Sequence, residues 1–375
     1  MIPFNKPFLV GKEIKYIEES VLSGKISGNG LFTKKCQTFF EEKFGFKKAL
    51  LTTSCTDALE MTAMLMDIKP GDEVIVPSYT FVSSALAYVR QGAKIVFADS
   101  RTDHPGIDER SVEELITSKT KAIVVVHYAG VAVEMDIIMQ IANKHSLLVV
   151  EDAAQSIDSY YNGRPLGSIG HFGVFSFHET KNIISGEGGL LTINDDRFID
   201  RAEVIWEKGT NRSAFFKGEV NKYGWVDTGS SFLPSELIAA FLFAQLEQLK
   251  EIQDKRKLLW KTYYNGLIEL ENNNKLKLAV IPSGATNNAH MFYLVTKDLE
   301  QRDAIIKFLK NNNIHAVFHY LSLHKSSFHT KDLKDIQDLP NADLYTDCLV
   351  RLPMFYDLEL DEVHEIINVI NGFFK

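Results

Sequence analysis

Cysteine is scarce in this chain of 375 residues, whose only thiols belong to Cys36, Cys55 and Cys348. An odd number without metal-like spacing excludes a disulfide framework and a cysteine-rich zinc site. We therefore expect no metal. Cysteines used in this way are typical of a reducing compartment, so we also expect the protein to be cytoplasmic.

Net positive charge and long hydrophobic runs are lacking as well. The formal net charge is −8, so we expect neither nucleic acid nor an anionic membrane surface as a partner. No apolar run reaches membrane-spanning length, and the N-terminal MIPFNKPFLVGKE lacks the apolar core of a signal peptide. The chain is 45% hydrophobic and 24% charged, which is ordinary for a globular protein, and its length suits one large and one small domain.

Short apolar strands alternate with helical segments in the first half of the chain. This alternation predicts an α/β fold with a doubly wound, mainly parallel sheet, whose sites lie at the carboxyl ends of the strands. No Gly-x-Gly-x-x-Gly follows the first strand, which argues against a dinucleotide-binding protein. The expected strands cover 49–51, 73–76, 94–98, 122–127 and 147–150, with helices at 12–22, from a cap at Thr33 to Phe44, and at 135–144.

The second half of the chain is helical at first and then mixed. Its pattern indicates a small α+β domain, so we expect a large domain over residues 1–250, N-terminal arm included, and a small domain over 251–375. The expected elements are a helix at 196–207, a long helical segment at 237–270, strands at 291–295 and 316–320, and helices at 302–310 and 361–373.

One lysine stands at the tip of a strand beside a glycine-rich turn. The stretch 171–195 begins as an apolar run, becomes polar at HETKN, passes through Gly-Glu-Gly-Gly and returns as a second apolar run. Two strands joined in this way place Lys181 at the connection. Lysine is the residue type that forms a Schiff base with an aldehyde cofactor.

Three other strand ends carry polar side chains. Thr53-Ser54-Cys55-Thr56 opens a helix, which indicates either an anion site, plausible for phosphate, or ordinary capping by Ser54 or Thr56. Asp152 and Gln155 follow a buried strand, where the carboxylate could hold a metal, cap a helix or pair with a protonated ring nitrogen. His127 ends a strand as a hydrogen-bonded core residue or as a catalyst.

The order of these signals predicts a site for pyridoxal phosphate. Helix N–H groups and hydroxyls suit the phosphate, and an aromatic residue after a strand, Phe81, suits the ring face. A strand-end aspartate suits the ring nitrogen, and the lysine of a Ser-x-x-x-x-Lys turn (Ser176, Lys181) suits the aldehyde.

The sequence resembles the DegT/DnrJ/EryC1/StrS sugar aminotransferases from end to end. Within them it is most similar to the WecE (RffA) type, the dTDP-4-amino-4,6-dideoxygalactose transaminases, because SFHETKN together with EKGTNRS is specific to that subgroup. The stretches that carry the resemblance are MIPFNKPFLVG, LLTTSCTDALEM, PGDEVIVPSYTFVS, GAKIVFAD, VVHYAGVAVEMD, VVEDAAQS, FSFHETKN, GEGG, EKGTNRS, KYGWVDTGSS and NAHMFY.

The resemblance implies fold type I of the pyridoxal-phosphate enzymes, with a seven-stranded sheet between helices, and a homodimer whose sites lie at the subunit interface. It also implies roles for single residues. Lys181 would form the Schiff base and shuttle the proton, Asp152 would pair with the pyridinium nitrogen, and Gln155 would lie by the phenolic oxygen. Phe81 would stack on the ring, Cys55, Thr56 and Ser176 would bind the phosphate, and Lys208, Arg212, His319 and Tyr320 are candidates for the nucleotide-sugar site.

The implied reaction is transamination between L-glutamate and dTDP-4-dehydro-6-deoxy-D-glucose through the pyridoxal and pyridoxamine phosphate forms of the cofactor. The product would be dTDP-4-amino-4,6-dideoxy-D-galactose for surface polysaccharide. Two alternatives stay open. The same fold could make the 4-amino-glucose epimer or a 3-amino sugar, or the chain could be a non-catalytic regulator that keeps the fold. Sugar dehydratases carry histidine where Lys181 stands, which disfavours that class.

Overall fold

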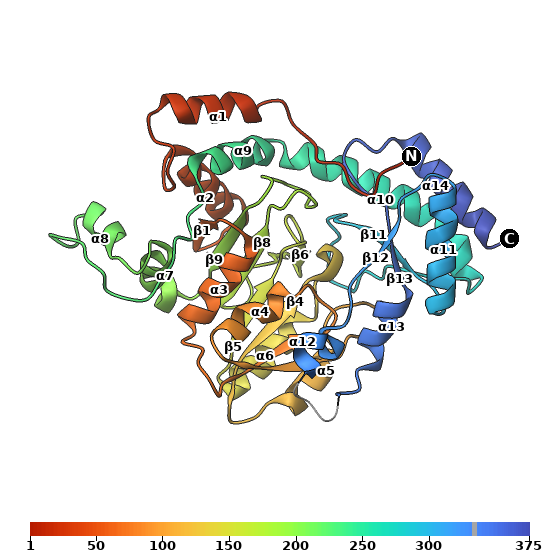
Figure 1. The fold of residues 1–375 in the computed structure, drawn as a ribbon, viewed down its shortest axis with the longest axis horizontal. Helices are drawn as coiled ribbons and strands as arrows, with labels where there is room; N and C mark the ends of the chain where they lie inside the picture. The colour runs from red at the N-terminus through yellow and green to blue at the C-terminus, as the bar shows by residue number, and fades with distance from the viewer. Residues whose placement is uncertain (332–335) are drawn as a thin grey trace.

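A seven-stranded sheet forms the centre of the larger domain in the computed structural model, which describes residues 1–331 and 336–375 (Figure 1). Every neighbouring pair is parallel except the two that involve β9, which runs antiparallel to its neighbours β1 and β8. The expectation of a mainly parallel sheet is therefore confirmed. The strands, in spatial order, are β1 (Lys48–Thr52), β9 (Gly189–Ile193), β8 (Phe172–Ser176), β5 (Leu148–Asp152), β4 (Thr120–Val126), β2 (Glu73–Pro77) and β3 (Lys94–Ala98).

Helices cover both faces of this sheet because its central strands are apolar on both sides. Alternate residues of β4 enter different cores. Val124 joins the core that contains Leu59 of α3 (Cys55–Leu65), whereas Ile123 joins the core that contains Ile138 of α6 (Met135–His145). A third core joins β1 and β8 to α2 (Leu31–Phe44) and α9 (Glu236–Glu247), and α4 (Ser83–Arg90) and α7 (Ile199–Trp206) complete the covering helices.

The smaller domain has a four-stranded antiparallel sheet covered on one face by three helices (Figure 1). Alternate residues of its strands again separate two cores. Val350 packs with those helices, whereas Leu349 and Tyr293 pack with the larger domain. The strands are β10 (Lys277–Leu278), β11 (Phe292–Val295), β13 (Leu349–Leu352) and β12 (Val317–Phe318), and the helices are α10 (Leu249–Asn272), α11 (Leu299–Asn311) and α14 (Leu360–Phe373).

The N-terminal arm connects the two domains. Ile2 forms a β-bridge with Ile314, the carbonyl of Phe4 accepts from Met354 N–H at 3.4 Å, and Phe8 stacks on Tyr356 with ring centroids 3.8 Å apart. The arm then runs along α10 and α9 to the first helix (Figure 1). The remaining elements are α1 (Glu13–Leu22), α5 (Glu109–Val112), β6 (Tyr160–Tyr161), β7 (Arg164–Pro165), α8 (Arg212–Phe216), α12 (Ser327–Thr330) and α13 (Pro340–Cys348).

Three details differ from the sequence expectation. The long helical segment at 237–270 is two helices, α9 and α10, because Gln248 leaves the helical conformation with φ −106° and ψ 13°. The strand expected at 316–320 is paired only at Val317 and Phe318. The segment 196–207 starts with a 3-10 turn, Asp196–Phe198, before α7 begins. Within the described residues, no helix is both long and apolar enough to cross a membrane.

The cap expected at Thr33 is wrong. Helix α2 begins at Leu31, and its first N–H groups are satisfied by Glu236, a buried carboxylate from α9. Glu236 accepts from the N–H groups of Gly30, Phe32 and Thr33 at 2.8, 2.7 and 3.1 Å, and also from the Thr33 hydroxyl. A Cβ on Gly30 would lie 2.5 Å from Glu236 Cδ, so a side chain there would displace the carboxylate from these hydrogen bonds.

We expect Glu236→Ala to lower the free energy of unfolding by about 3 kcal/mol or more, because it leaves several buried N–H donors without an acceptor. Glu18→Ala, at an exposed position of α1, is the control and should change it by less than about 0.5 kcal/mol. Urea titration measures both. Equal midpoints for the two variants would contradict this account of the α2 terminus.

Candidate active site

The first turn of α3 closes the carboxyl end of β1. Ser54 Oγ accepts from Asp57 N–H at 3.1 Å, so Ser54 is the cap. Among the described residues, no acceptor takes the backbone N–H groups of Cys55 or Thr56, which is the arrangement that binds anions at helix N-termini. The Asp57 side chain accepts from the Thr53 hydroxyl instead of entering that space.

A glycine from the turn after Lys181 packs directly under this helix. A Cβ on Gly189 would lie 2.4 Å from the carbonyl atoms of Ser54 and 2.5 Å from Cys55 N. No larger residue could stand there without moving the helix start. The Gly-Glu-Gly-Gly turn therefore brings the lysine-bearing connection and the α3 terminus to one edge of the sheet.

Asp152 is the buried last residue of β5. Ser84 Oγ donates to its Oδ2 at 2.6 Å, and Ala154 N–H donates to its Oδ1 at 3.1 Å. Burial raises the pKa of Asp152, while these two hydrogen bonds and the charge of Lys181 act in the opposite direction. A carboxylate withdrawn from water in this way is suited to pair with a buried cation.

Lys181 is half-buried in the connection between β8 and β9. The pKa of Lys181 is lowered to about 8, mainly by loss of water; the charge of Arg351 acts in the same direction, while Cys55 and Asp152 act to raise the pKa. A lysine with such a pKa carries an appreciable fraction of neutral amine near pH 7–8, which is the form that attacks a carbonyl.

Aromatic side chains from both domains lie near Asp152 and Lys181; we call Phe81, Tyr128, His319 and Tyr320 the aromatic wall. Gln155 Oε1 accepts from Ala129 N–H at 2.6 Å, and its Nε2 donates to the Tyr320 hydroxyl at 3.3 Å. The ring of Tyr320 lies 6.0 Å from that of Phe81, whose side chain is 56% exposed. His319 Nδ1 lies 2.9 Å from the Tyr128 hydroxyl.

The phosphate candidates lie at strand and helix ends as expected. Ser176 ends β8 and accepts from His178 N–H at 3.3 Å, and the Thr56 hydroxyl lies 2.8 Å from that of Ser83. The structure thus gathers most of the predicted set: Cys55, Thr56, Phe81, Asp152, Gln155, Ser176, Lys181, His319 and Tyr320.

Lys208 and Arg212 are not brought to this group within one chain. Both are exposed, and they line a separate cavity of about 420 Å³ together with Gly28 and Asn29, which lie between α1 and α2. Arg212 lies 3.9 Å from the carboxylate of Glu207 and over the ring of Phe216. None of the residues around Lys181 lines that cavity.

His127 is a core residue, the first of its two interpretations. It is fully buried, and its Nε2 lies 3.0 Å from Glu151 Oε2. The same carboxylate accepts from the N–H groups of Gly167, Ile169 and Gly170. This network holds the chain between β5 and β8.

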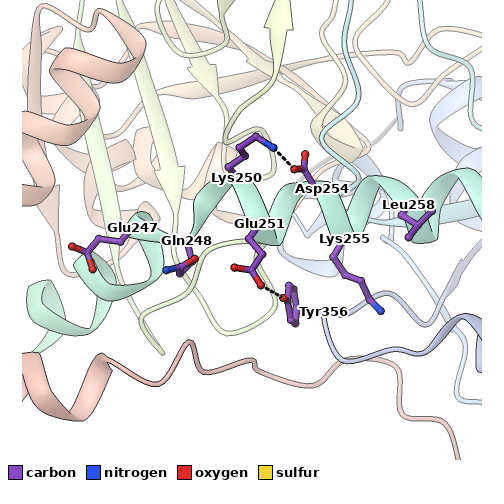
Figure 2. A pocket seen from close by; sticks show the side chains of 8 residues that line it. All are labelled: Glu247, Gln248, Lys250, Glu251, Asp254, Lys255, Leu258 and Tyr356. Carbon is purple, nitrogen blue, oxygen red and sulfur yellow. Dashed lines mark hydrogen bonds and ion pairs between the residues drawn. The ribbon is translucent and has the colours of Figure 1, made fainter.

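A larger cavity, of about 580 Å³, lies along the start of α10 and contains none of the candidate site residues (Figure 2). Its charges are paired with their neighbours: Lys250 with Asp254, and Glu251 with the Tyr356 hydroxyl at 2.9 Å. In the part of the chain that the structure describes, no group of three His, Cys, Asp or Glu side chains could hold a metal ion.

Comparison with known proteins identifies the family. The model of the DegT/DnrJ/EryC1/StrS aminotransferase family matches residues 8–371. This chain belongs to that family. An uncharacterized protein of Methanocaldococcus jannaschii is 30% identical over 377 residues, which cover 98% of this chain and 96% of the relative.

Solved structures agree with this membership. A putative sugar aminotransferase from Streptococcus pneumoniae, in its PMP form, is 26% identical, with a TM-score of 0.92 over 100% of this chain and 99% of the other. The aminotransferase PseC of Helicobacter pylori is 25% identical, with a TM-score of 0.90 over 100% and 99%. The chain is a sugar aminotransferase with the fold of the pyridoxal-phosphate enzymes, and its cofactor is pyridoxal phosphate.

The residues present fit this cofactor. Asp152 offers a buried carboxylate to a ring cation, Lys181 an amine of lowered pKa to an aldehyde, and the α3 terminus unpaired N–H groups to a phosphate. When bound, the cofactor supplies the electron sink that lets an amino group pass between two substrates.

Three residues of this region carried no interpretation from the sequence: Ser84, Asn182 and Arg351. Ser84 follows Phe81 in VSS and could have been found only from its contact with Asp152. Arg351 did have a signal, because it is a lone charge inside the apolar strand Leu349–Leu352.

We expect the attachment of pyridoxal phosphate to Lys181 in the apoprotein to accelerate as pH rises through about 8 rather than through 10.5, because the amine is neutral only above its pKa. Borohydride reduction followed by peptide mass spectrometry measures the labelled fraction at each pH. Lys181→Ala is the control and should remove the label. A midpoint near 10.5 would contradict the desolvated environment.

Proposed function

We propose that this sugar aminotransferase converts dTDP-4-dehydro-6-deoxy-D-glucose and L-glutamate into dTDP-4-amino-4,6-dideoxy-D-galactose and 2-oxoglutarate, for surface polysaccharide. The observation that carries the proposal is the pair of motifs SFHETKN (176–182) and EKGTNRS (207–213), which resemble the WecE-type subgroup. The first contains Lys181, and the second contains the two exposed cations Lys208 and Arg212. A nucleotide sugar brings a diphosphate, for which such cations are suited.

The proposed cofactor contacts are those that the sequence predicts for each part of pyridoxal phosphate. Asp152 pairs with the ring nitrogen, Gln155 lies by the phenolic oxygen, and Phe81 covers one ring face. Cys55, Thr56 and Ser176 hold the phosphate. The hydrogen bonds of Ser84 and Ala154 support this assignment, because they fix the Asp152 carboxylate and favour its charged form.

Lys181 is the proposed proton carrier as well as the attachment point. Its pKa of about 8 lets the Nζ atom accept a proton from the carbon that bears the amino group and release it again at neutral pH. His319 and Tyr320 lie on the opposite wall, where they can orient the sugar ring. Tyr320 is itself positioned by the hydrogen bond from Gln155 at 3.3 Å.

The working unit is proposed to be a homodimer with sites at the subunit interface. Lys208 and Arg212 lie apart from Lys181 within one chain, so they would act on the site of the second subunit. The segment after them projects from the body with α8 (Figure 1), and it exposes large apolar side chains, with Phe216 70% and Trp225 84% exposed. Such a surface favours burial against another chain.

Two alternative functions differ from this proposal in the product that they form. The 4-amino-glucose epimer or a 3-amino sugar would come from the same chemistry with a different sugar orientation. A non-catalytic regulator would need none of the gathered set, yet Lys181, Asp152 and Gln155 are all present. Their presence favours an enzyme.

We expect Asp152→Asn to weaken retention of pyridoxal phosphate by about tenfold to a hundredfold, because a charge-assisted hydrogen bond contributes about 1.5–3 kcal/mol. Turnover should fall as well, since a neutral amide no longer keeps the ring nitrogen protonated. Dialysis with absorbance readings measures retention. Asp158→Asn, whose carboxylate pairs with Lys257 at the surface, is the control, and equal losses in the two variants would contradict the assignment.

The product decides the sugar specificity. Incubation of the purified enzyme with dTDP-4-dehydro-6-deoxy-D-glucose, L-glutamate and pyridoxal phosphate should give a 4-amino sugar with an axial amine, as read from proton couplings by NMR. An equatorial amine, or an amine at C3, would replace the galacto assignment by one of the alternatives. No amino sugar, with Lys181→Ala indistinguishable from the wild type, would favour a regulator.

A further inference from the structure

Arg351 lies on the face of the small-domain sheet that is turned toward the larger domain. It belongs to β13, where Val350 and Leu352 pack into the small-domain core. Leu349, two residues before it, packs instead with the core of the larger domain, and so does Tyr293, its register partner in β11. Because side chains alternate along a strand, the guanidinium of Arg351 is directed into the space between the domains.

The same strand borders the aromatic wall of the site. On its other edge Arg351 is paired in register with Val317 of β12, and that strand leads within two residues to His319 and Tyr320. The Tyr320 hydroxyl accepts from Gln155, and its ring lies beside that of Phe81. The electrostatic effects agree with this placement. Burial is the largest cause that lowers the pKa values of Lys181 and His319, and the charge of Arg351 is a further cause in the same direction.

No acidic partner neutralises this guanidinium. Among the described residues, 1–331 and 336–375, Arg351 takes part in no hydrogen bond or ion pair, and its Nε atom is buried without an acceptor. The ring of Phe4 in the N-terminal arm lies 4.7 Å from its guanidinium carbon. Because the Phe4 ring covers only one face of the planar guanidinium, the N–H groups at its edge stay available for hydrogen bonds.

Arg256 shows how this protein treats a buried arginine that is structural. Its guanidinium donates to the carbonyls of Ala289 at 3.0 Å, His290 at 2.6 Å and Met354 at 3.4 Å. Its Nε and Nη2 donors are thus occupied by backbone acceptors, whereas the Nε of Arg351 is not. A buried donor without an acceptor costs free energy, so a ligand that supplies one is favoured.

We propose that Arg351 binds the carboxylate of the amino donor and thereby makes α-amino acids, rather than simple amines, the donors of this enzyme. The inference rests on the proposed donor half of the reaction. A guanidinium and a carboxylate match as two parallel hydrogen bonds, and a keto sugar brings no such group near its reacting carbon. The diphosphate of the nucleotide is the other anion available, and Lys208 and Arg212 already offer cations to it in a separate cavity.

The test uses the enzyme loaded with pyridoxal phosphate and two unreactive probes, glutarate for the donor and dTDP for the nucleotide. Calorimetry should show that Arg351→Gln weakens glutarate binding by about tenfold to a hundredfold and leaves dTDP binding unchanged. Lys297→Gln removes an exposed cation from the same domain and should change neither. Unchanged glutarate binding in Arg351→Gln, weakened dTDP binding alone, or no glutarate binding to the wild type would overturn the proposal.

A second variant, Arg351→Lys, distinguishes a loss of binding from a loss of folding. Arg351→Lys keeps the charge but loses the planar fork, so glutarate should bind more weakly than to the wild type and more tightly than to Arg351→Gln. In the half-reaction with L-glutamate alone, followed by cofactor absorbance, both variants should need more glutamate for half-maximal rate. Saturation equal to the wild type in both would contradict a role in donor binding. Because no sugar is present, this result does not depend on which sugar the enzyme makes.

Discussion

The buried carboxylate of Asp152 is the constraint on which the site depends. A charge with this burial is stable only if its partners are fixed, and the fold supplies Ser84 from α4 and the N–H of Ala154 from the turn after β5. β5 lies between β4 and β8, so the carboxylate emerges at the centre of the sheet edge.

A second polar network fixes the lysine next to it. Asn182 Nδ2 donates to Gln253 Oε1 at 2.7 Å and to the carbonyl of Asn288 at 2.9 Å, and its Oδ1 lies 2.9 Å from His290 Nδ1. Asn288 in turn donates to the carbonyl of Gln155. Since these residues come from the lysine turn, α10 and the segment before β11, one buried network ties the lysine turn to the small domain.

How much of this could be predicted differs from element to element. The strand 94–98 was placed residue for residue, because apolar residues bounded by a glycine and a polar turn form a local signal. The Thr33 cap was wrong because Glu236, about two hundred residues away, competes for the same N–H groups. The break at Gln248 was missed because the apolar period continues through it. Leu249 and Ile252 at the start of α10 still share the core of α9, and α10 enters the small-domain core only from Leu259 onward.

The sequence by itself determined the alternation of strands and helices, the positions of Asp152 and Lys181 at strand ends, and the motifs that indicate a sugar aminotransferase. All of these are local, since periodicity and short motifs are read within one segment. The tertiary structure alone decided that Ser84 holds Asp152, that Glu236 caps α2, and that Arg256 donates to backbone carbonyls while the Nε atom of Arg351 has no acceptor. Those facts depend on contacts between segments far apart in the chain, and burial decides which polar group finds its partner there.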